Sequence, residues 1–104
     1  MNEWIRVCRA DEIEEEDLLR WDHGDHSYAI YNTEKGIYAT DGYCTHEKQH
    51  LEEGLVIGMT VECPLHQGRF DIATGKALSP PVCENLKTYP IILKDGSVYI
   101  QLGN

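Results

Sequence analysis

Basic residues are scarce in this 104-residue chain, in which nine Lys and Arg stand against 18 Asp and Glu, for a formal net charge of −9. Such a surface repels phosphate backbones, so nucleic acid is not expected as a partner. Long hydrophobic runs are also lacking, since no segment approaches the roughly 18 apolar residues that cross a bilayer. The N-terminus has no basic stretch followed by an apolar one, so no signal peptide is expected. The sequence therefore predicts a soluble cytoplasmic protein without a membrane segment.

Helical periodicity is almost absent as well. The best helical candidate, residues 10–16, contains Ile13 as its one apolar residue after Ala10, which allows at most one or two turns. Four cysteines could form two disulfides. Without a secretion signal that interpretation is weak, because the cytosol keeps thiols reduced. The length indicates a single domain over residues 1–104.

What the chain does contain is a series of short β-like runs between turn residues. Asp95-Gly96 separates the last two runs and is a strong hairpin signal. Short strands at this spacing predict an all-β sandwich or barrel. Between residues 41 and 81, five glycines and three prolines interrupt the pattern, which favours loops built around something other than an apolar core. The β-like runs are residues 4–7, 18–21, 28–31, 37–40, 89–93 and 97–102.

The most informative feature is a short pattern that occurs twice, a Cys followed closely by a His. It is found in Cys44-Thr45-His46 and in Cys63-Pro64-Leu65-His66, with 16 residues between His46 and Cys63. Each box supplies one thiolate and one imidazole on a turn after a β-like run. Two Cys and two His can bind a structural zinc ion or a Rieske-type [2Fe–2S] cluster. Zinc fingers usually pair Cys with Cys and His with His along the chain. A dinuclear cluster held between two loops needs mixed boxes if each loop is to reach both irons.

With its surroundings, this pattern resembles a Rieske ferredoxin of bacterial aromatic-ring dioxygenase systems. The likeness covers essentially the whole chain and implies an all-β fold, with a β-sandwich base and a small cluster-binding lobe at approximately residues 41–83. It also implies that Cys44 and Cys63 bind the buried iron of one [2Fe–2S] cluster. By the same resemblance, His46 and His66 bind the outer iron. The matching segments are residues 44–46, 51–54, 61–66, 70–71, 74–77, 80–81 and 86–90.

The function implied by the resemblance is that of a one-electron carrier. Such a carrier accepts electrons from a flavin-dependent NAD(P)H ferredoxin reductase and delivers them to a terminal Rieske non-haem iron oxygenase in the catabolism of aromatic hydrocarbons. We expect a monomer with no catalytic residue of its own. An oxygenase would need a further iron site of two His and one carboxylate. Only His23, His26 and His50 remain for it, and 104 residues leave no room for a catalytic domain.

Two other functions stay open at this stage. One is a structural zinc-binding module without redox activity. The other is the small subunit of a nitrite reductase, which has a related fold; such subunits often lack the ligands, whereas this chain has all four.

One departure from a related subtype bears on the redox chemistry. Rieske proteins of cytochrome complexes carry an extra, disulfide-bonded cysteine in each box, where this chain has Gln49 and Leu65. They also place serine and tyrosine hydroxyls near the cluster, at the positions of Gly68 and Phe70.

Several residues outside the boxes have simpler interpretations. Cys8 is expected to be a buried small hydrophobic residue in a strand, and Cys83 is expected to pack after the Pro80-Pro81 loop. His23 and His26 fall in a predicted hairpin loop and are expected to be surface residues. His50 is expected to be exposed to solvent in the first cluster loop.

Overall fold

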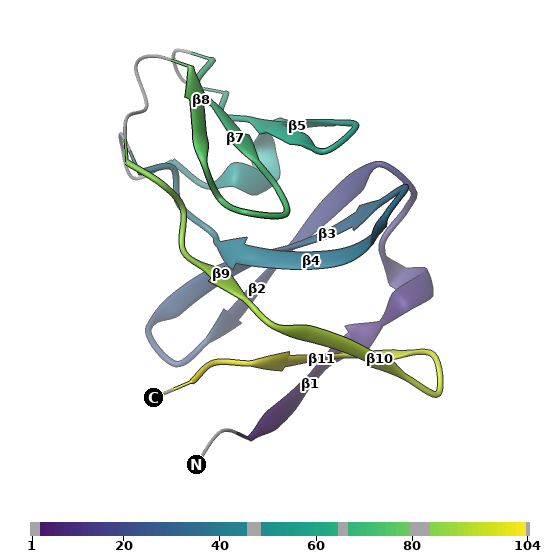
Figure 1. Cartoon of the computed structure of the whole chain (residues 1–104). Helices are drawn as coiled ribbons and strands as arrows, with labels where there is room; N and C mark the ends of the chain where they lie inside the picture. Colours follow the sequence, from purple (N-terminus) through teal and green to yellow (C-terminus); the bar gives the residue numbers. More distant parts are fainter. Residues whose placement is uncertain (1–2, 46–48, 65–66, 80–83, 104) are drawn as a thin grey trace.

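Short antiparallel strands make up almost all of the regular structure in the computed structural model of the chain (Figure 1). The described residues are 3–45, 49–64, 67–79 and 84–103. Within them, no helix is long and apolar enough to cross a membrane. The prediction of an all-β fold is therefore confirmed.

The described residues form three sheets, and two of them make up what we name the base. The first base sheet has the order β1-β11-β10 and the second has the order β2-β3-β4-β9. The strands of the first sheet are β1 (Trp4–Arg9), β10 (Ile91–Lys94) and β11 (Ser97–Gln101). The strands of the second sheet are β2 (Asp17–His23), β3 (His26–Thr33), β4 (Gly36–Asp41) and β9 (Thr88–Tyr89).

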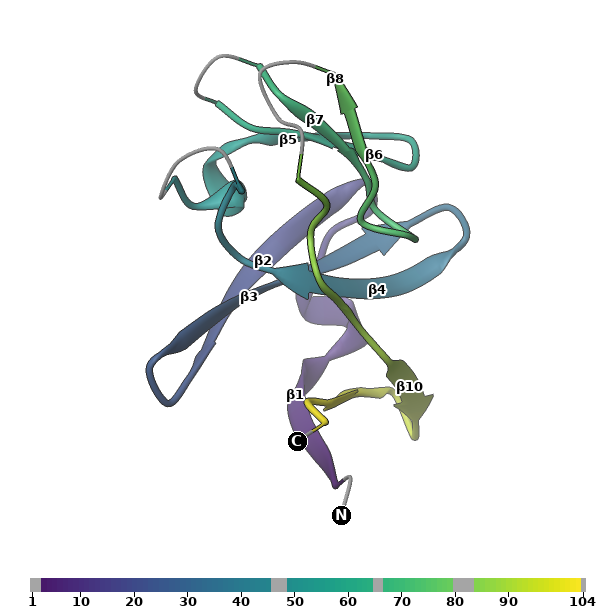
Figure 2. The ribbon, with the colours of Figure 1, turned by 60° about the vertical axis from the view of Figure 1, so that its left-hand side comes forward.

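The third sheet, with the segments joined to it between residues 41 and 83, is named the lobe. Its strand order is β5-β6-β7-β8. These strands are β5 (Leu55–Ile57), β6 (Thr60–Glu62), β7 (Arg69–Asp71) and β8 (Ala77–Ser79). Figure 2 shows the lobe sheet on one side of β2 and β4, with β1 and β10 on the other side. The sheet β2-β3-β4-β9 is thus the middle layer.

Five β-like runs of the sequence coincide with base strands. The run 89–93 is instead divided at Pro90 between β9 and β10, which belong to different sheets. The helical candidate is shorter than its predicted span. Only Ala10–Glu12 forms a 3₁₀ turn. The Glu12 carboxylate accepts the backbone N–H of Arg9 at 2.9 Å, which closes the turn at its start. Ile13 then returns to extended backbone and is buried, so packing of its side chain ends the turn.

Strand β3 contributes side chains to both hydrophobic cores, because its residues alternate between the two faces of the middle sheet. Tyr28 and Ile30 pack in the base core, with Val98 and Ile100 of β11. Ala29 and Tyr31 pack in the lobe core. The other buried members of the lobe core are Leu18, Cys44, Leu51, Val56, Val61, Cys63, Phe70, Ile72 and Leu86.

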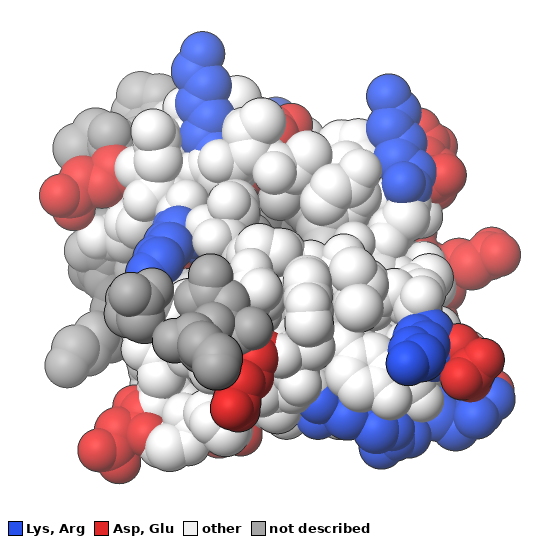
Figure 3. Space-filling view, turned by 60° about the horizontal axis from the view of Figure 1, so that its bottom comes forward, with Lys and Arg blue, Asp and Glu red and all other residues white. Residues whose placement is uncertain are grey.

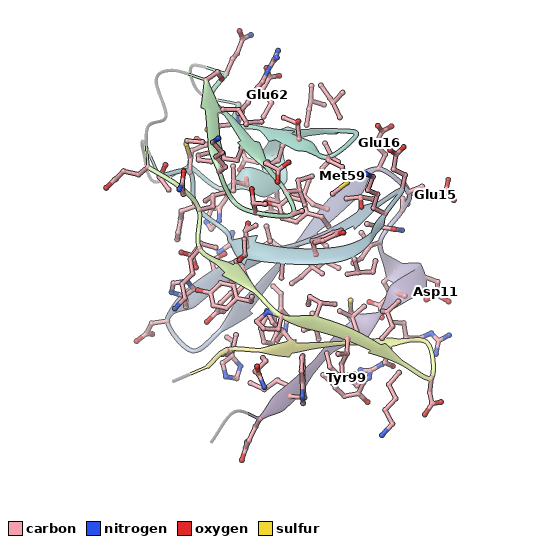
Figure 4. All side chains as sticks on the ribbon, viewed as in Figure 1. Asp11, Glu15, Glu16, Met59, Glu62 and Tyr99 are labelled. Carbon is pink, nitrogen blue, oxygen red and sulfur yellow. The ribbon has the colours of Figure 1, made fainter. Side chains whose placement is uncertain are left out.

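Hydrogen bonds also join the lobe to the segments that flank the middle sheet. The Glu16 carboxylate, just before β2, accepts the N–H of Gly58 at the turn between β5 and β6, at 2.9 Å. Figure 4 shows Glu16 beside Met59 at this junction. On the other side, the N–H of Leu86 donates to the carbonyl of Gly75 at 2.7 Å. The underside of the base shows mainly uncharged atoms at its centre, with charged side chains towards its margins (Figure 3).

Close approach of two backbone segments leaves no room for a side chain at Gly75. Gly75 has φ +78°, and a Cβ added there would lie 2.1 Å from the carbonyl oxygen of Leu86. Gly58 has φ +59°, but a Cβ there would meet nothing within 4 Å. Alanine therefore costs about 1–2 kcal/mol at either position for its left-handed backbone. At Gly75 alone, the overlap adds a further cost of about 1–3 kcal/mol.

We therefore expect Gly75→Ala to lower the free energy of unfolding clearly more than Gly58→Ala does. Urea unfolding of the two variants, followed by circular dichroism, measures this difference. Equal losses of stability would contradict the close packing of residues 75 and 86.

Candidate metal centre

The first Cys-His box follows directly from the end of β4. Three backbone hydrogen bonds hold the two ends of its loop. The N–H of Gly42 donates to the carbonyl of Ser27 at 2.8 Å, and the N–H of Leu51 donates to the carbonyl of Gly42 at 2.8 Å. The N–H of Cys44 donates to the carbonyl of Gln49 at 2.9 Å. The loop stem is therefore held in one conformation from both sides.

The second box lies in the hairpin between β6 and β7. The N–H of Cys63 donates to the carbonyl of Gly68 at 2.7 Å, which closes the hairpin loop. Gln67 has φ +57°, a left-handed conformation that is uncommon for a residue with a side chain. Beside the loop, Arg69 Nε lies 3.1 Å from Glu62 Oε2 across the two strands. The described ends of the turn, Cys63 and Gly68, are thus joined by this hydrogen bond.

Both cysteines of the boxes are buried in the lobe core, where Cys44 is 5% exposed and Cys63 is 0% exposed. Leu51 and Phe70 are fully buried in the same core. Two thiol side chains at the stems of two loops form a donor set suited to zinc or to an iron–sulfur cluster. His46 and His66, the other predicted ligands, lie outside the described residues. Within the described residues, no group of three or more His, Cys, Asp or Glu side chains is arranged to bind a metal ion.

A third segment, which follows residues 80–83, is tied to the stem of the first box. Thr45 Oγ1 donates to the carbonyl of Glu84 at 2.8 Å. The N–H of Asp41 donates to the carbonyl of Lys87 at 2.9 Å. Pro80, Pro81 and Cys83 lie outside the described residues, so their predicted places stay predictions.

Asp41 is a junction that the sequence analysis missed. Its Oδ1 accepts the hydroxyl of Tyr89 at 2.5 Å and lies 2.7 Å from Nε2 of His26. Burial, and then the hydrogen bond to Asp41, raise the pKa of Tyr89 well above its usual value, so the hydroxyl stays a donor at neutral pH. Asp41 thereby links the hairpin between β2 and β3, the end of β4, and β9. No local sequence signal marks this contact, because its partners are 15 and 48 residues away.

The remaining residues mostly behave as predicted. Cys8 is buried in the base core, where burial and the nearby Glu12 raise the pKa of its thiol. His23 is exposed and stacks on Trp21, with ring centroids 5.2 Å apart. His50 differs from expectation, because it is only partly exposed and its Nδ1 atom is buried.

Comparisons with known proteins complete the description of the site. The family described as "Rieske [2Fe-2S] domain" matches residues 3–90. The ferredoxin component of a naphthalene 1,2-dioxygenase system from Pseudomonas putida is 44% identical over 100 residues, covering 96% of each chain. The ferredoxin of Sphingomonas yanoikuyae B1 has a TM-score of 0.91 at 33% identity, covering 97% of this chain and 100% of its own. A ferredoxin–oxygenase complex of carbazole 1,9a-dioxygenase contains a chain with TM-score 0.90 at 33% identity, with coverages of 94% and 92%.

Proposed function

Because the chain belongs to the Rieske [2Fe-2S] domain family, we propose that it is a one-electron carrier that serves a terminal aromatic-ring oxygenase. The observation that carries this proposal is its similarity, over nearly the full length of both chains, to ferredoxin components of dioxygenase systems. The electrons are proposed to come from a flavin-dependent NAD(P)H ferredoxin reductase. The chain is then an electron-transfer component and not an enzyme.

The cofactor is one Rieske-type [2Fe–2S] cluster, and we propose that Cys44, His46, Cys63 and His66 bind it. In such a centre two thiolates hold one iron and two imidazoles hold the other. The burial of Cys44 and Cys63 in one core supports the placement of the thiolate-bound iron on the inner side. We assign the cluster to the lobe, approximately residues 41–83, within a single domain.

The bound cluster would supply reversible one-electron chemistry. The protein supplies a buried apolar surface beside the two cysteines. Leu51 and Phe70 keep water from the cysteine side, and an apolar shell of this kind influences the redox potential.

The three remaining histidines have other contacts, which supports the role of a carrier without a second iron site. His23 stacks on Trp21, His26 bonds Asp41, and the ring of His50 lies 4.4 Å from that of Tyr43.

The net charge of −9 favours a partner with a basic face, since complementary charge speeds encounter. We propose that the protein works in the cytoplasm as a monomer, without a nucleic-acid or membrane partner.

Removal of single ligands tests the proposed cluster site. We expect His46→Ala, His66→Ala and Cys44→Ser each to abolish the Rieske electron paramagnetic resonance spectrum after dithionite reduction, because each removes a metal bond. Cys8→Ser, a buried cysteine of the other core, is the matched control and should keep the spectrum and two irons per chain. A ligand variant with an unchanged spectrum would refute its assignment. A colourless wild-type protein that contains zinc would refute the cluster itself.

Electron transfer between purified proteins tests the carrier role directly. The reduced holoprotein, mixed by stopped flow with an oxidised Rieske aromatic-ring oxygenase, should be reoxidised as the oxygenase is reduced. The flavin-dependent reductase with NADH should then reduce the carrier again. If the cluster is intact but exchanges no electrons with either protein, the carrier role is wrong although the cluster site stands.

The reduction potential follows from two missing hydroxyl groups. Gly68 and Phe70 stand where high-potential relatives place serine and tyrosine, and Phe70 is fully buried in the lobe core. A hydrogen bond to a charged acceptor contributes about 1.5–3 kcal/mol, which is roughly 65–130 mV for one electron at about 59 mV per tenfold step. Since Rieske centres span roughly −150 to +300 mV, we expect a midpoint below about 0 mV at pH 7. Protein-film voltammetry measures it, and a midpoint above about +150 mV would show that other donors compensate.

A further inference from the structure

The outer face of the lobe sheet carries three exposed apolar side chains. Leu55 and Ile57 of β5 are 59% and 55% exposed, and Leu78 of β8 is 49% exposed. Val56, between the first two, is buried, so Leu55 and Ile57 share the face that points away from the core. Apolar patches with polar margins on a soluble domain mark surfaces that another molecule covers.

An open hollow of about 380 Å³ joins two of these side chains. The residues that line it come from all four strands of the lobe sheet and are Ile57, Thr60, Arg69, Leu78 and Ser79. Arg69 pairs with Ser79 and directly follows Gly68, which closes the loop of the second box. Ile57 pairs with Thr60 at the turn between β5 and β6. The hollow therefore extends from the stem of the second box to this turn.

The wall of the hollow holds a polar atom that lacks a partner in the described part of the chain. Ser79 Oγ is buried and makes no hydrogen bond there. Native proteins have few such atoms, and each calls for an explanation. Ser79 as a whole is only partly buried, so rotation about its Cα–Cβ bond would turn the hydroxyl towards the hollow. This arrangement suits an occupant that brings the missing hydrogen-bonding group with it.

The margin of the apolar patch beside the β5–β6 turn is acidic. The Glu16 carboxylate accepts the N–H of Gly58 in this turn at 2.9 Å, so the segment before β2 lies against it. Glu15 and Glu34, both exposed, line a second depression together with Glu16 and Gly58. Figure 4 shows Glu15 and Glu16 beside the end of β5. Three carboxylates thus lie next to the exposed side chain of Ile57.

The opposite end of the patch is closer to neutral. Arg69 Nε lies 3.1 Å from Glu62 Oε2, so these two charges offset each other. Leu55 is paired with Glu62 and is the apolar residue at this end. The surface thus combines an apolar centre with one acidic margin, and its complement is a protein surface with an apolar centre and a basic margin.

We propose that the hollow and the residues around it, named the lobe face (Leu55, Ile57, Leu78 and Ser79), bind the terminal oxygenase. An apolar side chain of the oxygenase fills the hollow, and basic side chains of the oxygenase lie beside the acidic margin. The inference rests on the proposed function, which names this partner. The oxygenase is chosen over the reductase because a solved complex of carbazole 1,9a-dioxygenase pairs a chain of this fold with an oxygenase. Docking on the lobe face sets the oxygenase beside the second box.

Two exposed leucines of similar accessibility test the lobe face. Leu78→Ala should weaken binding of the oxidised holoprotein to the purified oxygenase of the Pseudomonas putida naphthalene 1,2-dioxygenase system about tenfold, as for truncation of a central apolar contact. Leu93→Ala, in β10 of the base, is the matched control and should leave binding unchanged. Isothermal titration calorimetry measures both dissociation constants. Equal effects of the two substitutions would overturn the proposal, as would a wild type that does not bind this oxygenase.

Neutralisation of the acidic margin tests the charge complementarity. Glu15→Gln combined with Glu34→Gln should slow association with the oxygenase at low salt, and the difference should shrink at high salt because exposed charges are screened. Glu3→Gln combined with Asp95→Asn makes the same change of net charge in the base and should slow association less. Equal rates for the two double variants in stopped-flow mixing would show that only the net charge matters, and would overturn the basic margin of the oxygenase.

Ser79→Ala tests the hydroxyl at the wall of the hollow. It removes a group without a partner, so the free energy of unfolding of the free chain should not fall. Binding of the oxygenase should weaken roughly threefold, as expected for the loss of one neutral hydrogen bond. Ser27→Ala removes another unpartnered hydroxyl, at the stem of the first box, and should leave binding unchanged. A Ser79→Ala variant that loses stability but keeps full affinity would refute a hydrogen bond from the oxygenase.

The same titrations with the flavin-dependent reductase decide which partner uses the lobe face. Leu78→Ala should leave reductase binding unchanged, and a loss confined to the reductase would overturn the choice of the oxygenase. A protein that passes electrons to the oxygenase with an affinity that Leu78→Ala does not alter keeps the carrier role and loses this docking surface. A holoprotein that binds the oxygenase through Leu78 but exchanges no electrons with it keeps the docking surface and loses the carrier role.

Discussion

Burial of β3 on both of its faces is the constraint on which the rest of the molecule depends. Tyr28 and Ile30 fill the base core, while Ala29 and Tyr31 fill the lobe core. A slip of one residue in the pairing of β3 would exchange these two sets, so the register is strongly specified. The buried hydroxyl of Tyr31 bonds Thr40 Oγ1 on the neighbouring strand at 2.9 Å, which satisfies the main polar group that this packing brings inside. One strand thereby positions the lobe relative to the base.

The proposed cluster site is supported by this arrangement. Cys44 and Cys63 belong to the same core as Tyr31, so the stems of both boxes rest on the middle sheet. Asp41 adds a polar tie at the end of β4 from which the first box follows, between His26 and Tyr89. A site held by packed stems and supporting hydrogen bonds keeps its ligands in a fixed geometry. Such support suits a centre that gains and loses an electron without rearranging its surroundings.

The sequence predicted the base better than the lobe, for physical reasons. Apart from the two-residue β9, the base strands are long enough for alternating side chains and turn residues to mark them, whereas β5 to β8 have three residues each and lie among glycines and prolines. The structure places Cys44 and Cys63 in one core, whereas their role as cluster ligands stays a prediction. The place of Asp41 could not be predicted, because its partners, His26 and Tyr89, are 15 and 48 residues away. Exposure was the wrong expectation for His50, since its loop folds back against Tyr43.

The acidic surface bears on how the proposed carrier meets a partner in its two redox states. An oxidised cluster with two cysteine thiolates is formally neutral, since two Fe³⁺ balance two sulfides and two thiolates. Reduction would therefore add one charge to a protein that already carries −9. That single charge is small beside the charge already present, so the electrostatic field that steers a partner with a basic face is nearly the same in both redox states.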